Sequence, residues 1–145
     1  MGQDLTLGTA RRLVAATLRA AREFGLKPVA VAVLDSRACI RMLASEDRAG
    51  LRLPQIAIGK AHAALAVGVG TRTIANAALA RPHFVPGVAL AAGGSFVSVP
   101  GGVLIRNRRG DVVGALGVTG DSADNDEKTA VAGIEALGLT ADPGV

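Results

Sequence analysis

The strongest indication of the fold is PGGVLI, residues 100–105, followed by RGDVVGALGVTG, residues 109–120. A turn at Arg109-Gly110-Asp111 is expected to join two apolar runs into a hairpin. The second run carries glycine at positions 114, 117 and 120, which is typical of a strand whose backbone another element approaches closely. After Gly120 the sequence predicts a final helix that begins with acidic residues, where the helix dipole favours them.

The N-terminal third of the sequence predicts a helix followed by a hairpin. Thr6 is a plausible N-cap for an amphipathic helix of about five turns that ends at Gly25. The apolar runs 29–34 and 38–44 predict two strands joined by a short polar turn at Asp35.

The middle of the chain predicts two helices. Pro54 starts a helix that runs to about Val67 and is stopped by glycines. Thr71 caps a shorter helix, after which two prolines, at positions 82 and 86, predict an irregular segment. The tail from about residue 140 is expected to be loose. Hairpins separated by helices indicate one α+β domain, residues 1–145, with an antiparallel sheet.

This order of landmarks resembles the GlcG/HbpS family, which also includes the C-terminal domain of PduO-type proteins. The resemblance rests on residues 5–7, 28–35, 56–61 and 100–127, and covers nearly the whole chain. It implies a profilin-like α/β/α sandwich around a central antiparallel sheet. The chain departs from the family pattern at Ser36-Arg37-Ala38, where a glycine usually follows the strand aspartate, and at Ser45-Glu46-Asp47-Arg48.

Composition favours a self-associating domain. Half of the 145 residues are hydrophobic, yet Trp and Tyr are absent and only three Phe occur. The core must therefore consist of Ala, Val, Leu and Ile, and alanine-rich faces pack closely against copies of themselves. With the usual symmetry of soluble proteins and the family resemblance, this predicts a homo-oligomer.

The basic charge of +4 does not predict nucleic-acid binding. Arginines gather on the first helix and on the second hairpin, but no aromatic residues lie among them to stack on bases. A solvated face is the better interpretation. No signal peptide or membrane span is evident, so we expect a cytoplasmic protein without a membrane partner.

Cys39 is the only cysteine, which excludes an internal disulfide and a CxxC site. Its place in an apolar run predicts a core or half-buried residue. The two histidines have no zinc-site spacing, so no metal site is predicted.

Lys60 is the most unusual placement, because its neighbours on the helical face are all apolar. Burying a lysine is costly unless it is paired, neutral or reaching a pocket. Its ammonium could also extend to water along the apolar face. The family pattern matches Lys60, which implies a cationic anchor for an acidic ligand. On that basis Lys60→Met is expected to preserve or raise stability.

Five further residues are candidates for the site. Gly101 and Gly102 could admit a ligand to the backbone amides, or could simply form a turn. Glu127 matches the family's acidic pair and could line a site, whereas capping accounts for Asp124 and Asp126. His83, beside Phe84, is a better ligand candidate than His62, for which a structural role is favoured.

Three functions remain open. The first is a small-ligand-binding domain, for which the resemblance implies haem or a related tetrapyrrole, with Lys60, His83, Phe84, Gly101 and Gly102 at the site. The second is a cofactor-independent lyase or isomerase for a small carboxylated metabolite, with Lys60 as anchor and Glu127 or His83 moving a proton. The third is an accessory subunit. Similarity of fold cannot rank them, because function resides in the site.

Overall fold

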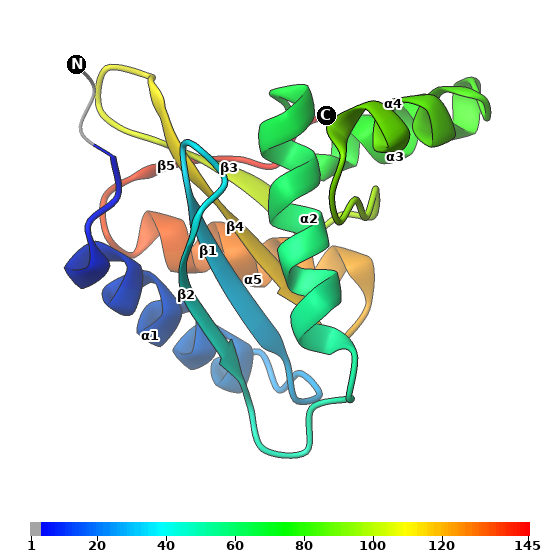
Figure 1. Cartoon of the computed structure of the whole chain (residues 1–145). Coiled ribbons are helices and arrows are strands. Elements are labelled where there is room, and N and C mark those ends of the chain that lie inside the picture. The colour runs from blue at the N-terminus through cyan, green and yellow to red at the C-terminus, as the bar shows by residue number, and fades with distance from the viewer. Residues whose placement is uncertain (1–3) are drawn as a thin grey trace.

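The computed structural model describes residues 4–145 as five helices and five strands (Figure 1). The helices are α1 (Leu7–Glu23), α2 (Leu53–Val67), α3 (Thr71–Ala80), α4 (Phe84–Ala92) and α5 (Ala123–Glu135). The strands are β1 (Ala30–Asp35), β2 (Ile40–Ser45), β3 (Gly102–Arg106), β4 (Val112–Thr119) and β5 (Thr140–Asp142).

The strands form one antiparallel sheet in the order β2-β1-β4-β3-β5. Helices α1 and α5 cover one face and α2 covers the other, as Figure 1 shows. The predicted α+β class, with helical layers on both sides of a central antiparallel sheet, is confirmed.

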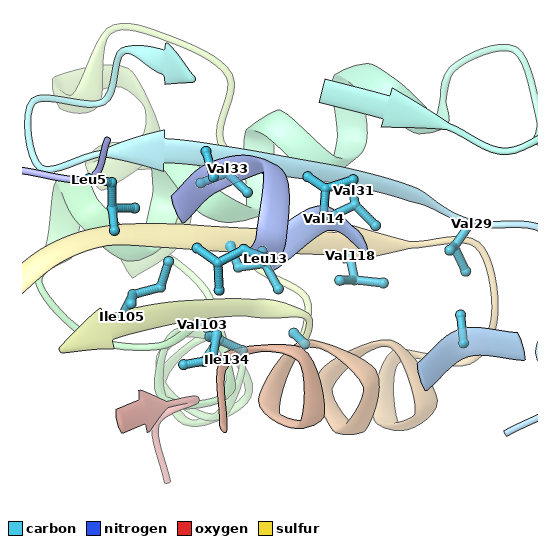
Figure 2. Packing of buried hydrophobic residues seen from close by; sticks show 14 of the residues in the cluster. Leu5, Leu13, Val14, Val29, Val31, Val33, Val103, Ile105, Val118 and Ile134 are labelled. Carbon is cyan, nitrogen blue, oxygen red and sulfur yellow. The ribbon is translucent and has the colours of Figure 1, made fainter. Parts of the chain in front are cut away.

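The larger part of the core lies between the sheet and the α1–α5 layer (Figure 2). Because side chains alternate along a strand, β1 directs Val31 and Val33 toward this layer and Ala30 and Ala32 toward α2. The other buried side chains of this cluster include Leu13, Val14, Val103, Ile105, Val118 and Ile134.

Helix α2 packs unusually close to the sheet because both the helix and the strands present small residues at their contact. A Cβ on Gly117 of β4 would overlap the carbonyl oxygen of Ala57, and one on Gly102 of β3 would overlap the carbonyl oxygen of Lys60. Of the glycines that the sequence places in this strand, Gly117 therefore allows the close passage of α2.

The turn between β1 and β2 is organised by the buried carboxylate of Asp35. Its Oδ1 accepts hydrogen bonds from the amides of Arg37 and Cys39, both at 3.0 Å, and Oδ2 pairs with Arg41 Nε at 3.0 Å. Burial alone would raise the pKa of Asp35, but these contacts lower it. The expected turn is confirmed. Cys39, however, is exposed in this turn rather than buried in a strand, because β2 begins only at Ile40.

Three further local predictions are wrong. Thr71 does not cap α3, because the N-cap is Gly70 and Thr71 is the first residue of the helix. The segment after Pro82 is helix α4, in which Pro86 occupies the first turn, where its missing N–H would have no intrahelical partner. The tail is not loose, because β5 pairs with β3 and the amide of Val145 donates to Thr73 Oγ1 at 2.8 Å. A three-residue strand is too short to show a recognisable alternation of apolar and polar residues.

Within residues 4–145 no single helix has the length and apolar character to cross a membrane. Helices α2 and α3, which are bent by 79° relative to each other, reach that length and apolar character only when taken together.

Candidate functional site

Lys60 is buried, with 2% of its surface exposed, and is held in an ion pair. Its Nζ donates to Asp126 Oδ2 at 3.2 Å and to the carbonyl oxygen of Val118 at 2.9 Å. The other carboxylate oxygen of Asp126 accepts from the amide of Asp121 at 3.0 Å. Among the alternatives open from the sequence, extension of the ammonium into water is therefore wrong, and pairing is correct.

Burial is the main influence on Lys60, and it lowers the pKa of the ammonium. The charge of Asp126 and its hydrogen bond act in the opposite direction and offset only part of this effect. The buried ammonium of Lys60 therefore loses its proton more readily than the ammonium of a solvated lysine.

The Lys60–Asp126 pair borders a cavity of about 450 Å³ between α2, the chain before β3, and the start of α5. Its walls are mainly apolar, and the lining residues are Ile56, Lys60, Val97, Val99, Thr119, Asp121, Ala123 and Asp126. One ammonium therefore faces two carboxylates. Hydrogen bonds from the Asn125 side chain and from the amides of Lys27 and Ser122 lower the pKa of Asp121 to about 2.

This charge pattern disfavours the acidic ligand expected from the sequence. The ammonium of Lys60 already has a carboxylate partner, and the Asp121 carboxylate lines the same cavity. A ligand carboxylate would meet net negative charge in a partly apolar space, where repulsion is weakly screened. A neutral or basic ligand suits the cavity better.

Gly101 and Gly102 pack around Lys60. The amide of Gly102 donates to Thr71 Oγ1 at 2.9 Å, so it is not free to bind an anion. Gly101 adopts φ +126°, and a Cβ there would lie 2.8 Å from Lys60 Nζ. Of the two interpretations left open, a backbone turn that makes room for protein atoms fits the contacts better than a ligand cradle.

Glu127 lies beside the cavity-forming helix start but does not line the cavity. It pairs with Arg72 of α3 at 3.1 Å, and Asp124 binds the same guanidinium at 2.6 Å. The N-cap of α5 is Ser122, whose Oγ accepts from the Asn125 amide at 3.1 Å. Capping was thus the wrong role for Asp124, which joins α5 to α3, and for Asp126, which is the buried partner of Lys60.

Helices α3 and α4, residues 71–92, form an arm that projects from one side of the domain (Figure 1). No residue of α4 is buried, and Leu79 and Leu90 expose 83% and 85% of their surface. His83 is exposed at the start of α4, and the Arg81 guanidinium lies 5.1 Å from the ring centroid of the half-buried Phe84.

The predicted site residues are therefore divided between two places. Lys60 lines the cavity and Gly101 packs against it, whereas His83 and Phe84 belong to the arm and line no part of that cavity. His62 is at neither, because its Nδ1 lies 2.6 Å from the carbonyl oxygen of Ser95, in keeping with a structural role. Among residues 4–145, no group of three His, Cys, Asp or Glu side chains could hold a metal ion.

Sequence reasoning missed most of the cavity. Asp126 could have been suspected, because a lysine on an apolar face requires an acidic partner, but several carboxylates were available. Val97, Val99 and Asp121 carried no signal, since they lie in irregular segments outside any motif.

A wider and more polar depression, lined by Arg22, Pro28, Ser45, Glu46, Asp47 and Arg48, is less suited to a ligand. Glu46 is already engaged there by Arg22 at 3.0 Å and by the amide of Val29 at 2.9 Å.

The comparisons with known proteins agree with this architecture. Among solved structures, HbpS matches with 28% identity and a TM-score of 0.81, over 94% of this chain and 92% of that one. The PduOC:haem complex matches with 24% identity and a TM-score of 0.82, over 94% and 97%. Protein ORFY of Klebsiella pneumoniae matches with 24% identity and a TM-score of 0.83, over 95% and 93%.

Among curated proteins none matches the chain. The family model described as "Haem degrading protein HbpS-like" matches residues 5–135, which is most of the sequence. The resemblance inferred from the sequence is confirmed, and the chain belongs to the HbpS-like family.

Proposed function

We propose that this protein binds haem or a related tetrapyrrole on the arm, residues 71–92, and that it does so as a homo-oligomer. The observation that carries the proposal is His83, an exposed imidazole at the start of a helix with no charged residue and no buried side chain. Haem requires an axial ligand for iron and an apolar surface for the porphyrin.

The arm fits these requirements better than the cavity does. His83 offers the axial nitrogen, Phe84 and the exposed leucines offer apolar surface, and Arg81 offers a cation for the propionates. The cavity offers no histidine, cysteine, methionine or tyrosine among its lining residues, and it carries net negative charge. When bound, haem would supply a redox-active iron; the chain itself would supply the ligand and the apolar contact.

Two similarities support the proposal. The family model is described as haem-degrading, and PduOC, a protein of similar fold, has been solved as a haem complex. An exposed apolar arm covers only one side of a planar ligand, so a second copy is the natural source of the other side.

Titration with haemin tests the ligand. A saturable shift of the Soret band is expected, and His83→Ala should weaken binding at least about tenfold by removing the iron ligand. His62→Ala is the matched control and should bind like the parent, since His62 is not on the arm. Featureless adsorption of haemin, or equal binding by both variants, would remove the proposal.

Light scattering tests the assembly. The protein should elute at twice the monomer mass or more, and Leu90→Glu should shift it toward the monomer, because a charge in an apolar interface lacks a partner. Leu51→Glu is the control, since Leu51 is 83% exposed but lies outside the arm. A parent protein that is monomeric at micromolar concentration would contradict homo-oligomerisation.

The other functions remain predictions. A lyase or isomerase that used Lys60 together with Glu127 or His83 is less favoured, because neither partner lines the cavity. An accessory subunit would show no saturable ligand. We retain a cytoplasmic location, without a membrane or nucleic-acid partner, as part of the proposal.

A further inference from the structure

The haem proposal leaves the cavity beside Lys60 without a use. Lys60 lines this space of about 450 Å³ together with the apolar residues Ile56, Val97, Val99 and Ala123. Two of the three N–H groups of the ammonium have acceptors among the described residues, Val118 O and Asp126 Oδ2. A primary amine is thus held at the wall of a largely apolar cavity, with a carboxylate 3.2 Å away.

We propose that Lys60 condenses with a small neutral aldehyde or ketone in this cavity to form a Schiff base. A buried lysine that faces a pocket is the group by which proteins bind carbonyl compounds covalently. The inference does not depend on haem binding, because His83 and Phe84 do not line the cavity.

Lys60 and Asp126 together supply every proton transfer that the condensation needs. Asp126 accepts one proton from the Lys60 ammonium, which leaves a free amine. The nitrogen lone pair attacks the carbonyl carbon, and a proton moves from that nitrogen to the carbonyl oxygen, which becomes the hydroxyl of a neutral carbinolamine. Asp126 then returns its proton to that hydroxyl, water departs, and a C=N bond remains. One ammonium and one carbonyl give one protonated imine and one water, Asp126 ends as a carboxylate as it began, and no oxidant or reductant is needed.

The environment of the amine supports this chemistry. Burial lowers the pKa of Lys60, so the nucleophilic form is more populated than in a solvated lysine. Gly101 leaves room for the Lys60 side chain itself, because a Cβ there would lie 2.8 Å from Nζ.

The lining residues also select the class of ligand. Asp121 and Asp126 disfavour a keto acid, and the apolar walls favour a short aliphatic body. A neutral aldehyde should therefore be preferred over an acidic aldehyde of similar size.

Reductive trapping tests the proposal on the intact protein. Propanal and cyanoborohydride are added at neutral pH, and the modified lysines are quantified by peptide mass spectrometry. Lys27 and Lys128, both exposed, are internal references on the same chain. Lys60 should be alkylated at least about tenfold faster than either, because the cavity holds the aldehyde beside the amine. Modification of Lys60 no faster than the references would overturn the proposal.

Two further measurements locate the reaction. Ala123→Leu narrows the cavity while preserving Lys60, and it should slow trapping at Lys60 severalfold. Ala136→Leu, at the exposed far end of α5, should leave the rate unchanged. Glyoxylate should label Lys60 more slowly than propanal does. An unchanged rate in Ala123→Leu would contradict binding in the cavity, and faster labelling by glyoxylate would contradict the neutral ligand.

Discussion

Lys60→Met is expected to destabilise the protein by about 3–5 kcal/mol, because removal of one partner leaves the buried carboxylate of Asp126 uncompensated. The sequence alone predicts the opposite sign, since it shows a costly charge and no partner. Urea unfolding of the variant measures the loss.

A second substitution separates the ion pair from simple packing. Lys60→Met combined with Asp126→Asn should recover most of the loss, because the asparagine is neutral and its side-chain oxygen can still accept from the Asp121 amide. Lys27→Met, at an exposed lysine, should change stability by no more than about 0.5 kcal/mol. If Lys60→Met were as stable as the parent, the ion pair would have no structural role.

Gly117→Ala is expected to cost about 3 kcal/mol or more, near the upper end of the usual overpacking range. The added Cβ would overlap the carbonyl oxygen of Ala57, and neither backbone can move without separating α2 from β4. The midpoint of thermal unfolding should fall accordingly. Such a displacement would also disturb Lys60, which lies about one helical turn after Ala57 on α2.

Gly87→Ala is the matched control for this substitution. Gly87 lies within α4, and a Cβ there would meet nothing within 4 Å. Because alanine is the better helix former, the change should be neutral or stabilising by up to about 1 kcal/mol. If Gly117→Ala and Gly87→Ala changed the stability equally, the close packing of α2 would not be the reason for glycine at position 117.

Local pattern alone predicted much of the fold. Thr6 caps α1 by accepting from the Thr9 amide at 3.1 Å, and Gly68 ends α2 in the left-handed conformation, as their residue types indicate. The hairpin around residues 109–111 and the helix after Gly120 also agree. These features depend on contacts within a few residues, which sequence periodicity records directly.

Elements shaped by distant contacts were not predictable in the same way. Thr140–Asp142 is a strand only because β3 offers an open edge. The helix that contains Pro86 was missed for a local reason, since proline is tolerated in a first turn. Short segments carry too few residues for a period to be recognised.

For the site, residue patterns alone indicated that Lys60 needs an explanation and that the chain resembles HbpS-like proteins. The identity of Asp126, 66 positions away, as the partner of Lys60 became known only from the folded chain, as did the place of Val97 and Val99 in the cavity lining and the position of His83 outside it. The physical reason is that an apolar neighbourhood reveals the cost of a buried charge locally, whereas the group that offsets the cost is chosen by the folding of the whole chain.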